Sequence, residues 1–188
     1  MNPTTKSQHQ SLPASRALWI ALVAALSIGS SLMMACAAPL VAVAALAAIS
    51  TNQREGLAMV MLAWLSNQII GYGFLNYPMD FNSFAWGAAL GLATFAGFFA
   101  ARYALTLSAS PMVSAAVAFL AAFVAYEAAI YAAGAVLGGA EAAFTLSALT
   151  YIFQVNVIAF AAIALIHRAA LALALIEPEH PAMRLPVA

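Results

Sequence analysis

The sequence predicts an all-α membrane protein with six transmembrane helices and both termini in the cytoplasm. Three observations support this prediction: the composition, the lengths of the apolar runs and the placement of the basic residues. The chain has 188 residues, of which 66% are hydrophobic and 6% are charged. A soluble domain carries about 25% charged residues. So few charges cannot cover the surface of a soluble protein, whereas lipid removes that requirement.

The apolar segments have the lengths that membrane spans need, which is about 20 residues. They are Ala17–Ser50, Gly56–Leu75, Ser83–Leu107, Met112–Gly138 and Ala142–Ile176. The middle three each predict one span, and the last predicts one span with an apolar extension. The first segment fits either one overlong helix or two short helices that turn near Pro39. Proline disfavours helix at the preceding residue and lacks a backbone donor.

The basic residues favour two helices in the first segment. With two helices and a cytoplasmic N-terminus, the cytoplasmic side receives Lys6, Arg16, Arg54, Arg102, Arg168 and Arg184. Asp80 and Glu141 then lie outside. This distribution follows the positive-inside rule. A single first helix would move Arg54 and Arg102 to the opposite side, so six spans are predicted.

The predicted domain organisation is a single transmembrane domain over residues 16–176. Residues 1–15 form a polar N-terminus, and residues 177–188 form a proline-rich polar tail. Basic residues precede the first apolar run, as in a signal peptide, but the run is too long for one, so we expect it to be retained. The single cysteine, Cys36, allows no disulfide within the chain. The zero net charge gives no indication of a nucleic-acid partner.

Small residues recur at four-residue spacing, which lets helices approach closely in lipid. The first apolar run carries Ala17, Ala21, Ala25 and Gly29 on one face. The fourth predicted helix carries the pairs Gly87 with Gly91 and Gly97 with Ala101. Two interpretations remain open for these faces. They pack within the chain, or they dock another membrane subunit.

Polar side chains inside the predicted spans gather toward the outer half of the membrane. The candidate site residues are Asn67, Gln68, Tyr72, Trp86, Glu127, Tyr131, Tyr151 and Gln154. Amides and aromatic rings in front of apolar walls are typical of a small-molecule cavity. Individually, the amides also suit hydrogen bonds between helices, and the aromatic residues also suit the interfacial belt.

Glu127 is the residue that most strongly indicates a functional site. A charged group at mid-bilayer costs at least about 2.5–3.5 kcal/mol on insertion scales, and no Lys or Arg is predicted at its depth. Its carboxyl group is therefore protonated, paired with amides and tyrosines, or matched by a cationic ligand.

Several kinds of chemistry have no motif in the chain. There is no P-loop, no Ser–His–Asp constellation, and no histidine pair or carboxylate cluster. We therefore predict a non-enzymatic protein without cofactor or metal. Two inverted halves, the usual sign of a self-contained carrier, are also not detectable. We therefore expect a chain that binds a solute as part of a larger system with an energising partner.

The profile resembles the S components of energy-coupling-factor (ECF) vitamin transporters. These substrate-capture subunits have similar size, six helices and cytoplasmic termini. A small-residue stripe on their first helix, here matched by Ala17, Ala21 and Ala25, docks a transmembrane coupling subunit that works with ATPases. The resemblance implies a vitamin site near the outer face, over the Asn67–Trp86 stretch. It also implies that Glu127, Tyr131 and Trp86 suit a cationic heterocycle, and it places the protein in the bacterial inner membrane.

Two functional hypotheses follow from the sequence. The first is a membrane-embedded solute-binding subunit of a micronutrient uptake system, with a closed outer pocket that includes Glu127. The second is a non-catalytic accessory or scaffold subunit, whose small-residue stripes bury against another chain and which has no cavity.

Overall fold

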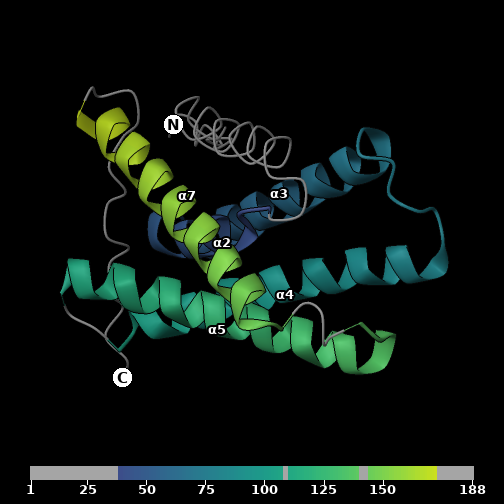
Figure 1. Ribbon diagram of the computed structural model, residues 1–188. Helices are drawn as coiled ribbons and strands as arrows, with labels where there is room; N and C mark the ends of the chain where they lie inside the picture. The colour runs from purple at the N-terminus through teal and green to yellow at the C-terminus, as the bar shows by residue number, and fades with distance from the viewer. Residues whose placement is uncertain (1–37, 108–109, 140–143, 173–188) are drawn as a thin grey trace, which may run out of the picture.

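The computed structural model describes residues 38–107, 110–139 and 144–172, and this part of the chain is all-α. Its helices are α2 (Leu40–Ser50), α3 (Gln53–Gly73), α4 (Phe81–Leu105), α5 (Pro111–Leu137) and α7 (Leu146–Ala172) (Figure 1). The bounds of α3, α4, α5 and α7 differ from the four corresponding apolar runs by at most four residues at either end.

Three helices are long and apolar enough to cross a membrane: Phe81–Leu105, Val113–Leu137 and Leu146–Ala170. They carry large apolar side chains on their outer surfaces, among them Leu92, Val124 and Leu165. These surfaces suit contact with lipid. The protein is therefore a multi-pass membrane protein. Helix α3 has 21 residues but is less apolar, because its second half includes Asn67 and Gln68.

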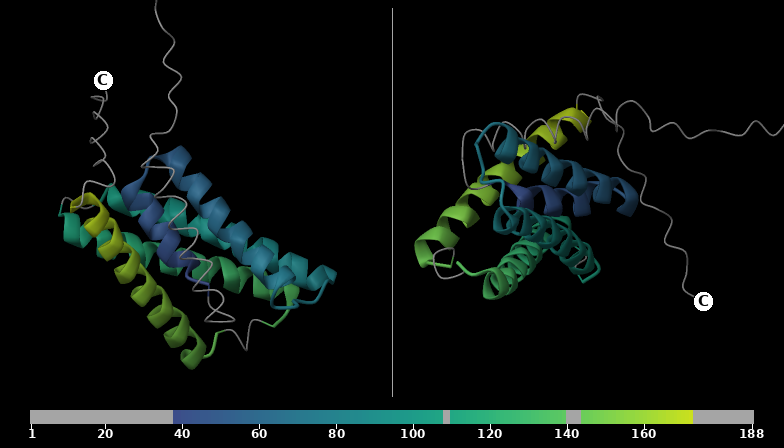
Figure 2. Two further views of the ribbon diagram at one scale, coloured as in Figure 1. Left: turned by 90° about the horizontal axis from the view of Figure 1, so that it is seen from above. Right: turned by 90° about the vertical axis from the view of Figure 1, so that its right-hand side faces the viewer.

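Helix α2 forms the centre of the bundle. It begins directly after Pro39, where the sequence predicted a turn, and every residue from Leu40 to Ala48 is buried. It contacts α3, α4, α5 and α7. Figure 2 shows it between α3 and the α4–α5 pair, while α7 crosses the bundle obliquely in Figure 1. Its alanines and valines let four helices approach a common axis. The preceding predicted helix, residues 17–37, lies outside the described residues.

The glycine and alanine pairs of α4 pack within the chain. A Cβ atom added to Gly97 would lie 3.1 Å from the carbonyl oxygen of Ala122 on α5, and Ala101 is fully buried. Gly91 faces the indole ring of Trp64 on α3. Of the two interpretations of these pairs, the structure supports packing between the protein's own helices.

Helices α3 and α4 form an antiparallel hairpin whose two ends differ in charge. Asn52 caps α3, because its side chain accepts a hydrogen bond from the Glu55 backbone N–H at 3.0 Å. Arg54 in the first turn of α3 and Arg102 in the last turn of α4 lie at the same end of the hairpin. There Arg102 donates a hydrogen bond to the Thr51 carbonyl oxygen at 3.1 Å. The connecting loop lies at the opposite end.

Candidate functional site

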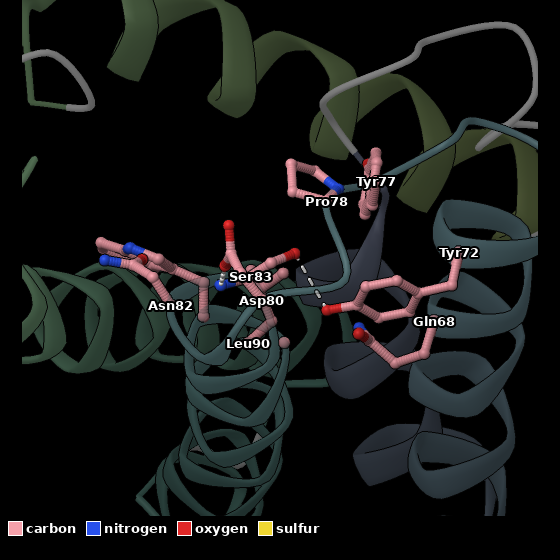
Figure 3. A pocket seen from close by; sticks show the side chains of 10 residues that line it. Gln68, Tyr72, Tyr77, Pro78, Asp80, Asn82, Ser83 and Leu90 are labelled. Carbon is pink, nitrogen blue, oxygen red and sulfur yellow. Dashed lines mark hydrogen bonds between the residues drawn. The ribbon is translucent and has the colours of Figure 1, made fainter.

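A cavity of about 380 Å³ lies between α3 and α4, at the end of the hairpin that carries the loop. The described residues that line it are Gln68, Tyr72, Tyr77, Pro78, Asp80, Asn82, Ser83, Trp86, Gly87 and Leu90. Figure 3 draws these residues and labels eight of them, with Gln68 and Tyr72 extending from α3 toward α4. The volume lies within the range of about 300–1,000 Å³ that is usual for small-molecule sites.

The loop wall of the cavity is held by Tyr77. The backbone N–H of Tyr77 donates to the Gly71 carbonyl oxygen at 3.1 Å, and its ring lies directly against Gly71. A Cβ atom at position 71 would be 2.5 Å from the ring, so only glycine allows this contact. The turn that leads to the Tyr77–Gly71 contact is made at Asn76. This residue has a φ of 54°, in the left-handed region that asparagine tolerates better than most residues.

Tyr72 forms the α3 wall of the cavity in a fixed orientation. Its hydroxyl group shares a hydrogen bond with the Ser83 hydroxyl group at 3.1 Å. Its ring stacks on Phe84, with centroids 4.9 Å apart, and meets the edge of Tyr77 at 5.9 Å. The hydroxyl groups of Tyr72 and Ser83 thus satisfy each other, and the aromatic face remains as the wall.

The base of the cavity depends on two glycines of α4. Trp64 donates its indole N–H to the Gly87 carbonyl oxygen at 2.8 Å and packs over Gly91. One turn further along α3, the side-chain amide of Gln68 lies against Gly87, in space that a Cβ atom would occupy. The two glycines therefore let large α3 side chains lie close to the α4 backbone.

Polar groups around the cavity differ in whether they already have partners. Asp80 caps α4 by accepting the Ser83 backbone N–H at 2.7 Å, and the Asn82 amide donates to the Leu137 carbonyl oxygen at 3.4 Å. In the described part of the chain, neither the amide of Gln68 nor the indole N–H of Trp86 has a hydrogen-bond partner. Groups of this kind are available to a solute in the cavity.

Among the described lining residues, the one charged side chain is the carboxylate of Asp80. Asp80 is the single Asp, Glu, Lys or Arg between residues 56 and 101, and no Lys or Arg is among the described lining residues. A phosphate or carboxylate group would find no counter-charge on these residues. The charge therefore favours neutral or cationic solutes.

Three of the predicted site residues, Gln68, Tyr72 and Trp86, meet at this cavity. Asn67 is half-buried on the neighbouring position of α3 and is not among the described lining residues. Gln154 and Tyr151 are exposed on α7. Tyr131 is 60% exposed on α5, and its ring meets the edge of Phe144 at 5.1 Å.

Glu127 is also separate from the lining residues described for this cavity. Its side chain is 9% exposed on α5, and its Oε1 atom has no hydrogen-bond partner among the described residues. The predicted docking stripe, Ala17, Ala21, Ala25 and Gly29, lies outside the described residues.

The loop residues lie within the Asn67–Trp86 stretch that the resemblance assigned to the site, although none of them was named as a site residue, and Trp64 was not predicted. The Tyr77-Pro78 pair and the cluster Asp80, Asn82 and Ser83 were available signals, because polar residues next to aromatic ones follow the end of α3. Trp64 gives no such signal, because its role depends on which face of α3 meets Gly87.

The described residues contain no group of three or more His, Cys, Asp or Glu side chains that could hold a metal ion. Comparison with known proteins gives no relative: the chain matches no protein-family model, no curated protein and no solved structure.

Proposed function

We propose that this protein is the membrane-embedded solute-binding subunit of an uptake system for a small organic molecule, such as a micronutrient. The observation that carries the proposal is the cavity at the loop end of the α3–α4 hairpin. It combines three aromatic side chains with the unpaired amide of Gln68 and the indole N–H of Trp86. A few placed polar groups within apolar walls are the usual composition of a small-molecule site.

The cavity faces the outside in this proposal. Arg54 and Arg102 lie at the end of the hairpin opposite to the loop, and basic residues concentrate on the cytoplasmic side of membrane proteins. The loop and its cavity are then exposed to solutes outside the bacterial inner membrane. The same rule, applied to the whole chain, gives six spans with both termini in the cytoplasm.

Energy for uptake comes from a partner in this proposal. The sequence holds no nucleotide-binding motif. A coupling subunit with ATPases, as in the ECF transporters that the sequence resembles, would supply it and would dock on the Ala17–Gly29 stripe.

The structure favours this proposal over a scaffold function. A scaffold was expected to have no cavity and to bury its small-residue stripes against another chain. The glycines of α4 instead pack against Trp64 and Ala122 of the same chain, and a cavity is present. Glu127 takes no part in the proposed site, because the cavity is built from α3, α4 and their loop.

Mass spectrometry of small molecules that co-purify with the protein tests the proposal. We expect one solute to be enriched with the wild-type protein and lost from Trp86→Leu and Gln68→Met. It should be retained by Glu127→Gln, which lies outside the cavity. Size-exclusion chromatography confirms that each variant is folded. Equal recovery from the wild-type protein and both cavity variants, or no enriched solute in any sample, would contradict the proposal.

A further inference from the structure

The side-chain amide of Gln68 is the most specific recognition group in the cavity. Trp64, Gln68 and Tyr72 follow one another at four-residue spacing, so they lie on the face of α3 that is turned toward α4. Trp64 and Tyr72 are held by hydrogen bonds to Gly87 and Ser83. Gln68 lies between them against Gly87, half-buried, with no hydrogen-bond partner in the described residues.

The position of Gln68 restricts how its amide can be used. Space against Gly87 exists only because that residue has no Cβ atom, so the amide is held at the base of the cavity. Figure 3 shows the amide end of Gln68 beneath the Tyr72 ring, turned toward α4. The amide atoms of Gln68 are not among the fully buried side-chain atoms without a partner, so they stay accessible to solvent from the cavity. A ligand in the cavity can therefore replace water at this donor and this acceptor.

A primary amide offers an N–H donor and a carbonyl acceptor side by side in one plane. The matching ligand edge has an acceptor and a donor at the same spacing, as in a lactam or an amidine. The rings of Tyr72, Tyr77 and Trp86 line the same cavity and favour a flat, aromatic-sized body. The described lining includes Asp80 and no Lys or Arg, so an anionic ligand group is disfavoured in this cavity.

We infer that the cavity recognises a planar, non-anionic heterocycle through a lactam-type or amidine-type edge that pairs with the Gln68 amide. This inference rests on the proposed function and names the substrate class of the same site. Sites built to form such hydrogen bonds reject analogues that lack one of the two groups, because the protein amide is then left unpaired.

Binding of the bicyclic lactam isoquinolone and of its N-methyl derivative tests the inference. The methyl group removes the donor of the lactam edge and keeps the ring and the carbonyl group. Equilibrium dialysis against the full-length protein in nanodiscs measures both affinities, with empty nanodiscs correcting for partition into lipid. We expect isoquinolone to bind the wild-type protein about tenfold more tightly, because the N-methyl derivative loses one hydrogen bond and leaves the Gln68 carbonyl oxygen unpaired.

Two variants of similar size separate Gln68 from its surroundings. Gln68→Met keeps the length of the side chain and removes the amide, so the preference should fall below about twofold. Asn67→Leu removes the neighbouring amide, which is not among the lining residues, and should keep the preference. Gln68→Asn draws the amide back by one methylene group and should also lose the preference, which provides a second variant if Gln68→Met fails to fold.

Equal affinity of the two compounds for the wild-type protein, or a preference that survives in Gln68→Met, would overturn the inference and leave a cavity that binds flat rings. Absence of binding by both compounds would also overturn it. The proposed function is judged separately, by the co-purifying solute.

Discussion

The side-chain oxygen of Asn156 accepts a hydrogen bond from the backbone N–H of Ala42, over a distance of 3.1 Å. Ala42 lies in the first turn of α2, where backbone N–H groups have no partner within the helix. Pro39, at the N-cap position, supplies no side-chain cap. Asn156 is 1% exposed, and its amide donates to the Ile152 carbonyl oxygen at 3.0 Å. Helix α7 thus caps the central helix from across the bundle.

Replacing this cap should destabilise the protein. Asn156→Leu leaves the Ala42 N–H buried and unpaired, and we expect unfolding to become easier by about 1–3 kcal/mol. Denaturant unfolding of the purified protein in detergent measures the change. Gln154→Leu is the matched control, because it removes an exposed amide from the same helix and should change stability by less than about 0.5 kcal/mol. Equal losses in the two variants would show that the cap has no special role.

A methyl group at position 91 should force the two helices of the cavity apart. In Gly91→Ala the new Cβ atom would lie 2.8 Å from the Trp64 ring, so the ring or the helix must shift. Overpacking of this kind costs about 1–3 kcal/mol. Thermal unfolding and the Trp64 hydrogen-exchange rate report the change. Gly73→Ala has no atom within 4 Å of the new Cβ and should leave both measurements nearly unchanged. A stable Gly91→Ala protein with unaltered Trp64 exchange would contradict the packing described here.

Asp80 should select for charge without contributing strongly to stability. In Asp80→Asn the capping oxygen is kept, because asparagine caps helices about as well as aspartate. We expect the affinity for the planar cation N-methylquinolinium to fall about threefold, a loss typical of partly solvated ion pairs. The affinity for neutral isoquinolone should stay constant. Dialysis at low and high salt checks the cause, since only the wild-type protein should bind the cation less tightly as salt rises. An equal loss for both compounds would indicate a structural effect instead.

The orientation of the hairpin is testable with single cysteines in a Cys36→Ala background. Met79 is 76% exposed in the loop, and Gln53 is exposed at the first residue of α3. A membrane-impermeant maleimide added to intact spheroplasts should label Met79→Cys, whereas Gln53→Cys should react only after the membrane is opened. The reverse pattern would turn the cavity toward the cytoplasm and would contradict uptake from the outer side.

The sequence predicted the helices well because the apolar runs end where polar residues and prolines begin. Pro39 marked the start of α2, and the apolar run from Ser83 began two residues after the first residue of α4. The depth of a side chain along its helix could also be predicted from the sequence. Counting residues from the ends of each apolar run places Gln68 and Trp86 at the same end of the hairpin.

Rotation about the helix axes was not predictable from the sequence. In alanine-rich spans both faces are apolar, and no strong pattern shows which face turns inward. Glu127 and Tyr131 were therefore grouped with Trp86 by depth and by the family resemblance, although they lie on α5, outside the described lining of the cavity. The contact of Trp64 with Gly87 depends on the register between α3 and α4, which the sequence does not reveal.

The short central helix has a consequence for biogenesis. At about 1.5 Å per residue, the 11 residues of α2 reach only about 16 Å, roughly half of the hydrocarbon thickness. Alone in lipid, α2 would leave its terminal peptide groups without partners inside the bilayer. We therefore expect α2 to become fully integrated only after the later helices have been synthesised. Asn156, which follows Ala42 by 114 residues, supplies the partner of the Ala42 N–H.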